Sequence, residues 1–203
     1  MENTMSRVTR SLPALACAAF CGLLSVPVMA DEGPGYTYFD VGYVRTDIDD
    51  IEENVDSLGL AGSFALTDNL YLFADYEDGS ASFERIDVDV STTLVGVGAN
   101  FGLSDTVDLF AEASYVNAEL EAGEFIEVDE SGFGLSAGVR AMVMPQLELN
   151  AGLSYVEIEE LDDTSLDLGA VYSFTDVFAL VLGVSFADNA NTYGVGVRFY
   201  IDR

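Results

Sequence analysis

The chain has 203 residues and a formal net charge of −29, with 36 acidic residues, seven basic residues and no histidine. This charge repels polyanions and so argues against a nucleic-acid-binding protein. The absence of histidine removes the commonest general base and metal ligand, so an enzyme is not expected. Half of the residues are hydrophobic, with 13 Phe and 10 Tyr, so the chain is expected to fold rather than to stay disordered.

Residues 1–30 have the form of a secretory signal peptide. Two arginines precede the apolar run "SLPALACAAFCGLLSVP", and the "VMA" that follows has small residues at the cleavage position. We expect cleavage after Ala30, which leaves 31–203 as one mature domain. Lipidation at Cys17 is a weaker alternative, because the apolar run continues well past it. Both cysteines leave with the signal, so no disulfide is expected.

From residue 36 onward, apolar residues alternate with small or polar ones, which is the period of a β-strand. "FALVLGVSF" (178–186) is an example: Phe178, Leu180, Leu182, Val184 and Phe186 share one face, and Ala179, Val181, Gly183 and Ser185 share the other. No apolar run approaches the roughly 18 residues of a transmembrane helix. The alternation predicts ten strands, at about 36–46, 54–66, 70–78, 88–102, 107–119, 131–143, 147–157, 164–174, 178–187 and 191–201.

Short and long connections alternate between these strands. Four are short: "TDN" (67–69), "SDT" (104–106), "MPQ" (144–146) and "TDV" (175–177). The others are predicted to be longer acidic loops, at 47–53, 78–87, 120–130, 158–163 and 187–190. Short turns at one end and long charged loops at the other are typical of bacterial outer-membrane barrels.

Aromatic residues on the apolar face fall at two levels. The upper level lies about eight to ten residues beyond the short turns, which is about 20–25 Å for a tilted strand rising about 2.5 Å per residue. This is the height of the apolar band of an outer-membrane barrel, so these residues are predicted to lie at the two membrane interfaces. The upper residues are Tyr43, Tyr76, Tyr115, Tyr155 and Phe186, and the lower ones include Phe101, Phe174 and Phe199.

The opposite face of the strands is predicted to line the lumen. Its charged residues include Asp40, Asp75, Asp108, Glu112, Arg140, Glu148, Asp167 and Arg198. Buried charges need partners, and we expect Arg140 between Glu112 and Glu148, and Arg198 against Asp40. The favoured interpretation is a structural ion-pair network in a narrow barrel filled by side chains. The alternative is a gate or selectivity element of a small pore, which the many glycines and serines of this face would allow.

The sequence resembles the small outer-membrane β-barrel superfamily of OmpA-barrel, OmpX and opacity-type proteins. The resemblance rests on "YTYFDVGYVRTDIDD" (36–50), "GSFALTDNLYLFADYE" (62–77) and "TYGVGVRF" (192–199), and it extends to a subfamily first named for an activator of plant immunity. It implies an all-β, transmembrane, antiparallel up-and-down barrel in a bacterial outer membrane. It also implies that the barrel assembly machinery reads the C-terminal strand. Ten strands are expected, with eight as the alternative.

We therefore expect a structural or surface-interaction role, exerted through the acidic loops. A narrow cation-preferring channel and a soluble periplasmic barrel that binds an apolar ligand are the alternatives. The expected partners are outer-membrane lipid and lipopolysaccharide, diffuse divalent cations and an unidentified surface partner, without nucleic acid or cofactor. A selective calcium site is not expected, because the spacing of Asp47 and Asp49 departs from the EF-hand pattern.

Overall fold

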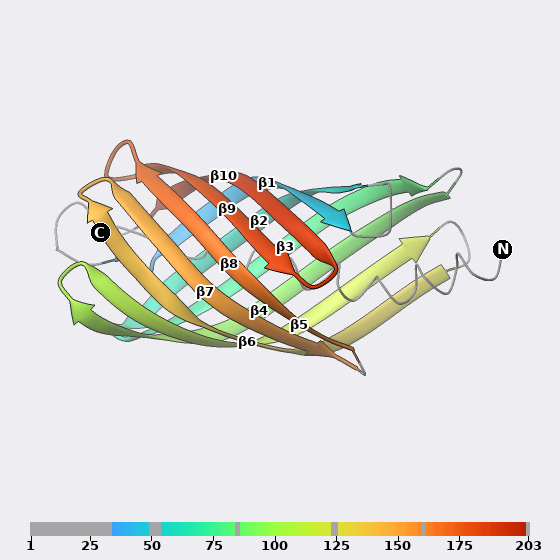
Figure 1. Cartoon of the computed structure of the whole chain (residues 1–203), viewed down its shortest axis with the longest axis horizontal. Coiled ribbons are helices and arrows are strands. Elements are labelled where there is room, and N and C mark those ends of the chain that lie inside the picture. Colours follow the sequence, from blue (N-terminus) through green and yellow to red (C-terminus); the bar gives the residue numbers. More distant parts are fainter. Residues whose placement is uncertain (1–33, 49–53, 84–85, 123–125, 160, 202–203) are drawn as a thin grey trace.

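Ten antiparallel strands form a closed barrel in the computed structural model of the chain (Figure 1). The structure describes residues 34–48, 54–83, 86–122, 126–159 and 161–201. The expected signal peptide, 1–30, lies outside the described residues. The strands are β1 (Tyr38–Ile48), β2 (Asn54–Thr67), β3 (Leu70–Phe83), β4 (Ile86–Ser104), β5 (Val107–Ala122), β6 (Ile126–Met144), β7 (Leu147–Ile158), β8 (Leu161–Ser173), β9 (Phe178–Ala187) and β10 (Ala190–Tyr200).

Each strand pairs with its neighbours in sequence, and β10 closes the barrel against β1. The prediction of ten strands in an up-and-down barrel is confirmed, and the eight-stranded alternative is wrong. The short turns and the C-terminal end of β10 lie at one end of the barrel, here called the turn end. The opposite end, where β3 meets β4 and β5 meets β6, is called the hairpin end.

The prediction of long acidic loops is wrong for most of the acidic runs. β3 continues to Phe83 and β4 begins at Ile86, so 78–87 is almost entirely strand. The same holds for 120–130 and 158–163, where the strands leave only short connections. In the run 47–53, Asp47 and Ile48 belong to β1 and 49–53 lie outside the described residues.

The two-residue alternation explains why these acidic runs remain strands. On β4, Val88 is buried while Asp89 is exposed, and on β5, Leu120 is buried while Glu121 is exposed. The inward face of these strands therefore keeps the apolar residues that pack in the lumen. The outward face changes from apolar to acidic along the strand. The paired backbone is unaffected by that change, because its hydrogen bonds run between strands. As a result, β4 and β6 reach 19 residues each, and the hairpins β3–β4 and β5–β6 project beyond β9–β10 (Figure 1).

The barrel is apolar outside and largely polar at the centre. Large side chains such as Leu58, Val97 and Leu153 are 57–66% exposed on the outer surface. Ion pairs of arginine and carboxylate are buried inside. This distribution inverts that of a water-soluble barrel and is the pattern of a transmembrane β-barrel, so a soluble periplasmic barrel does not fit. Within the described residues, no helix has the length and apolarity to cross a membrane.

The lumen changes character along its axis. Towards the turn end, charged and hydroxyl side chains lie beside a cluster of buried aromatic and aliphatic residues that includes Phe73, Val171 and Val181. Towards the hairpin end, buried charged side chains give way to apolar ones and a few hydroxyl groups. These apolar residues, here called the apolar collar, form two buried clusters. They are Ile48, Val55, Ala81, Leu94, Val116, Val156 and Ile158.

The small residues of the lumen make room for aromatic rings. A Cβ added to Gly98 would overlap the ring of Tyr71, and one added to Gly138 would lie 2.6 Å from the ring of Phe110. The expectation that these glycines leave space for a pore is therefore wrong at these positions. Rings from neighbouring strands occupy that space.

Replacing Gly98 by alanine is expected to destabilise the barrel by about 1–3 kcal/mol, because an overpacked interior must shift. The ring of Tyr71 has little freedom to move, since its hydroxyl is hydrogen-bonded to Glu112 at 2.7 Å. Urea unfolding of protein refolded into vesicles measures the change. Gly62→Ala is the matched control, because its Cβ would meet only the Tyr38 carbonyl oxygen, at 3.7 Å. Equal stability of the two variants would contradict this packing.

Candidate functional site

A bidentate ion pair lies at the seam where β10 closes against β1. Arg198 Nε and Nη2 donate to the two carboxylate oxygens of Asp40 at 2.7 and 2.6 Å. The residues are register partners, and both side chains are at most 1% exposed. The guanidinium carbon lies 3.7 Å from the centre of the Tyr38 ring, a cation–π contact. The expected pairing of Arg198 with Asp40 is thus present in the structure.

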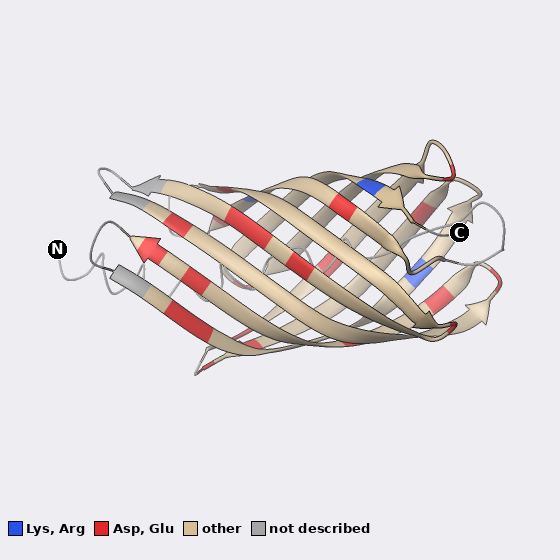
Figure 2. Ribbon diagram, turned by 180° about the vertical axis from the view of Figure 1, so that it is seen from behind, with Lys and Arg blue, Asp and Glu red and all other residues tan. Residues whose placement is uncertain are grey.

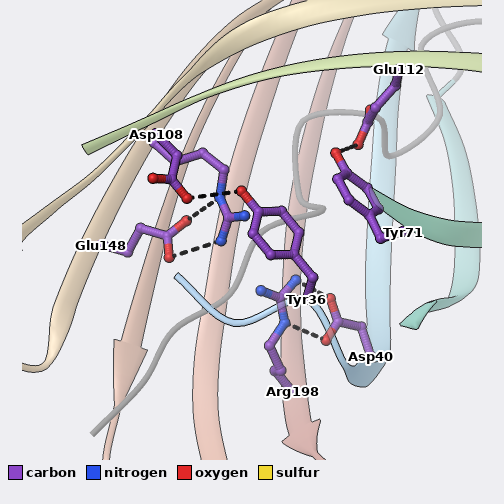
Figure 3. A network of polar contacts seen from close by, with 8 residues as sticks. Tyr36, Asp40, Tyr71, Asp108, Glu112, Glu148 and Arg198 are labelled. Carbon is purple, nitrogen blue, oxygen red and sulfur yellow. Dashed lines mark hydrogen bonds and ion pairs between the residues drawn. The ribbon is translucent and has the colours of Figure 1, made fainter. Parts of the chain in front are cut away.

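A second buried pair joins β6 to β7 (Figure 3). Arg140 Nε and Nη2 donate to Glu148 at 3.0 and 3.3 Å, and both side chains are at most 1% exposed. The Arg140 guanidinium also lies 4.5 Å from the centre of the Tyr36 ring. Tyr36 donates its hydroxyl proton to Asp108 at 3.1 Å and stacks on Tyr71, with ring centres 4.6 Å apart. The segment before β1 thereby packs into the turn end of the lumen.

Two of the remaining lumen carboxylates are held by hydroxyl groups. Glu112 accepts hydrogen bonds from Tyr71 at 2.7 Å and from Ser136 at 2.9 Å. Asp167 accepts from three serines on three strands, with oxygen–oxygen distances of 2.6, 3.2 and 2.6 Å for Ser154, Ser165 and Ser185. Asp75 is buried as well, but neither of its oxygens has a hydrogen-bond partner among the described residues.

Three tyrosines of this site, Tyr36, Tyr38 and Tyr71, were not anticipated from the sequence. Tyr38 and Tyr71 have the inward parity of Asp40 and Asp75 on the same strands, which is a signal for the lumen. This parity conflicts with the expectation that the aromatic residues of the strands lie on the outer face. Tyr36 begins the predicted strand 36–46 and has the same inward parity, although the observed β1 begins only at Tyr38.

All of the aromatic residues predicted at the membrane interfaces lie on the outer face of the barrel. At the upper level, Tyr43, Tyr76, Tyr115 and Phe186 are 42–56% exposed, and Tyr155 packs against Phe133 with ring centres 6.1 Å apart. At the lower level, Phe101 is exposed, and Phe174 and Phe199 belong to a continuous row of rings. This row runs Tyr172, Phe174, Phe178, Phe199, with successive ring centres 5.1, 6.1 and 5.5 Å apart.

Near the hairpin end the strands carry many acidic residues (Figure 2). Beyond the upper aromatic level, the exposed positions on the outer face are largely acidic. A groove of about 700 Å³ crosses this part of β1 to β5, and we call it the acidic groove. Tyr43, Leu58 and Tyr76 form its membrane side. Its carboxylates are those of Asp56, Asp78, Asp89, Glu119 and Glu121. Within the described residues, no group of three or more acidic, Cys or His side chains is arranged to hold a metal ion.

One carboxylate of the groove accepts hydrogen bonds from two side chains. Asp56 accepts hydrogen bonds from the Tyr43 hydroxyl at 2.5 Å and from Arg45 Nε and Nη2 at 2.9 and 3.1 Å. These contacts, that from Tyr43 first, hold the pKa of Asp56 below its ordinary value. Asp56 therefore stays ionised at neutral and mildly acidic pH.

The comparison with protein families agrees with this geometry. The profile of the outer membrane protein beta-barrel domain matches residues 16–174. The chain belongs to this family. Its place is therefore the outer membrane, and the resemblance inferred from the sequence is confirmed. A comparison with curated proteins gives no match.

Solved structures of other outer-membrane barrels are similar in fold. The NanC porin aligns with a TM-score of 0.53 and 8% identity, over 80% of this chain and 100% of that one. The KdgM porin in complex with disordered oligogalacturonate gives 0.47 and 11%, over 80% and 99%. Ail of Yersinia pestis, in complex with the heparin analogue sucrose octasulfate, gives 0.46 and 13%, over 81% and 97%. At such identities the likeness concerns the fold alone.

Removing one member of the seam pair is expected to cost far more than removing an exposed pair. Arg198→Leu leaves Asp40 buried and uncompensated, and a loss of about 3–5 kcal/mol in unfolding free energy is expected. Arg45→Leu, which breaks the exposed pair between Arg45 on β1 and Asp56 on β2, should change stability little. The double variant Asp40→Asn with Arg198→Leu should recover part of the loss. Equal effects of the two arginine variants in urea unfolding would show that the seam pair is not stabilising.

The titration of Asp56 gives a second check. A lowered carboxyl pKa stabilises the fold above the ordinary carboxyl pKa, and this contribution is lost as the pH falls through the lowered value. The Asp56 carbon resonance should therefore titrate below the range of a free aspartate. Tyr43→Phe should raise the midpoint, because it removes the donor with the largest effect. An unchanged midpoint would contradict the assigned hydrogen bond.

Proposed function

We propose that the protein is a non-conducting outer-membrane barrel that presents an acidic surface to cationic partners outside the cell. The observation that carries the proposal is the filled lumen. Arg140, Glu148 and Arg198 are at most 1% exposed, and the apolar collar packs beyond them. An open aqueous path along the axis would leave such side chains in contact with water, so a role at the surface is the better fit.

The chemistry of the outer face supports a positively charged partner. Asp89 on β4 lies directly opposite Glu121 on β5, and Glu119 lies directly opposite Asp129 on β6. Like charges facing each other across strands destabilise a sheet, and these four lie on the outer face of the projecting hairpins. A cationic partner placed over them relieves the repulsion and is attracted over a distance by the net charge.

The remaining partners follow from the position in the membrane. Outer-membrane lipid covers the apolar band between the two aromatic levels, and lipopolysaccharide lies at the level of the acidic groove. Its phosphates repel the groove carboxylates, so divalent cations are the proposed bridge between them. The segment "TYGVGVRF" on β10 is the proposed signal for the barrel assembly machinery, and residues 1–30 are the proposed export signal.

A narrow cation-preferring channel is the second candidate. It is favoured by the excess of carboxylates over guanidiniums in the lumen, because a negatively charged path attracts cations. Conduction requires that the two arginine pairs separate and that the apolar collar opens. The two candidates therefore differ in whether the folded barrel passes ions.

Planar-bilayer recording separates the two candidates. The refolded protein is expected to leave the bilayer silent, since the filled lumen blocks a continuous water path. Detergent-only samples give the background, and the NanC porin is a suitable conducting control. Discrete conductance steps that change size in Arg198→Leu would overturn the closed-barrel proposal in favour of the channel.

Binding of a fluorescent oligolysine peptide tests the acidic surface. The mature protein in zwitterionic detergent should bind the peptide, and added salt should weaken binding because the attraction is electrostatic. The double variant Asp89→Asn with Glu121→Gln should bind several-fold more weakly. Asp68→Asn with Asp105→Asn is the matched control, because it removes two exposed charges from the turn end. Equal losses in the two double variants would show that net charge, not the hairpin surface, controls binding.

A further inference from the structure

The buried charges of the lumen do not balance within the part of the chain that the structure describes. Six carboxylates and two guanidiniums are buried there, a formal excess of four negative charges. Removing an ion from water is costly unless an opposite charge compensates it. The hydroxyl donors to Asp108, Glu112 and Asp167 supply hydrogen bonds but no positive charge. The excess is neutralised either by protons bound to these carboxylates or by a cation taken from solution.

Asp75 is where this excess is least compensated. Its side chain is only 6% exposed, and neither of its oxygens has a hydrogen-bond partner among the described residues. Each of the other five buried carboxylates accepts at least one hydrogen bond from a tyrosine, serine or arginine. A buried ionised carboxylate without donors is among the most unfavourable groups in a folded protein.

The surroundings of Asp75 are themselves negative. The charged groups that act on it are the carboxylates of Glu112, Asp40 and Glu77 and the guanidinium of Arg198. Arg198 is already engaged with Asp40 in two hydrogen bonds. The register partners of Asp75 on the neighbouring strands are Ala61 on β2 and Leu94 on β4, and neither carries a charge. Neutralisation of Asp75 therefore takes a proton or a cation from solution.

We propose that a monovalent cation, Na⁺ or K⁺, binds in the lumen at Asp75. Carboxylate oxygens are the ligands that hard cations prefer. A tightly chelated divalent ion is not indicated, because no group of three or more acidic side chains among the described residues is arranged to hold one. A single buried carboxylate without another described partner suits a small monovalent ion rather than a divalent one. The apolar collar separates this ion from the hairpin end.

Thermal unfolding in matched salts tests the proposal on the mature chain refolded in zwitterionic detergent. NaCl, KCl and choline chloride are compared at one ionic strength, about 0.15 M, so that screening of the surface charges is equal. Choline is too large for the packed lumen. An ion that binds only the folded state raises the melting temperature. The wild type is therefore expected to melt about 2–4 °C higher in NaCl or KCl than in choline chloride.

Asp75→Asn removes the charge that binds the cation. Its melting temperature should be the same in all three salts and higher in choline chloride than that of the wild type. Asp78→Asn is the matched control, since Asp78 is exposed on the outer face of the same strand, β3. It should keep the difference between the salts. If Asp75→Asn does not refold, Asp75→Ser takes its place.

Two results would overturn the proposal. One is a wild-type melting temperature that does not differ between choline and the alkali cations, which would mean that a proton or no ion neutralises Asp75. The other is a salt difference that persists in Asp75→Asn but is lost in Asp78→Asn, which would place the cation on the outer surface. The first result leaves the binding of cationic partners at the hairpin end untouched, and the peptide assay tests that binding separately.

Discussion

Closure of the sheet is the constraint on which the rest of this structure depends. In a bilayer, each backbone N–H and C=O group must find its partner within the protein, so a spanning sheet has to form a ring without edges. Here β10 pairs with β1 along eleven register positions. The buried pair of Arg198 and Asp40 lies on this seam and joins the first strand to the last. The junction of the chain's two ends thus carries both hydrogen bonds and ionic attraction.

Closure also decides how the interior is filled. The inward face of ten strands cannot be wholly apolar or wholly charged, and this barrel divides it into two layers. Near the turn end, arginine, carboxylate, tyrosine and serine side chains form hydrogen-bonded groups, with rings lying over glycines such as Gly98 and Gly138. Near the hairpin end, the apolar collar packs as a small core. Together these side chains occupy much of the lumen, and the proposal of a closed barrel rests on this packing.

The distribution of acidic residues follows from the same geometry. Between the aromatic levels the outer face meets lipid, where ionised carboxylates are costly. Beyond the upper level the strands continue into water, and their outer positions are free to be acidic. The extended hairpins thus form a stiff acidic sheet, not a set of loose loops. Paired strands hold these charges at fixed register positions, and the proposed binding of a cationic partner rests on this arrangement.

The sequence by itself determined the ten strands, the two faces and the choice of which face meets lipid. Strand periodicity and the height of aromatics such as Tyr76 and Tyr115 are properties of each strand alone, so they can be read before the strands are assembled. Only the tertiary structure decided that the acidic runs are strand, because acidic residues on the outer face are equally compatible with a loop and with a strand that has left the membrane. It also decided that Glu112 and Asp167 bind hydroxyl groups, that Tyr36 enters the lumen and that Asp75 has no described donor. These contacts cross the lumen between strands, and their partners are set by register and stagger around the closed ring, which no single strand encodes.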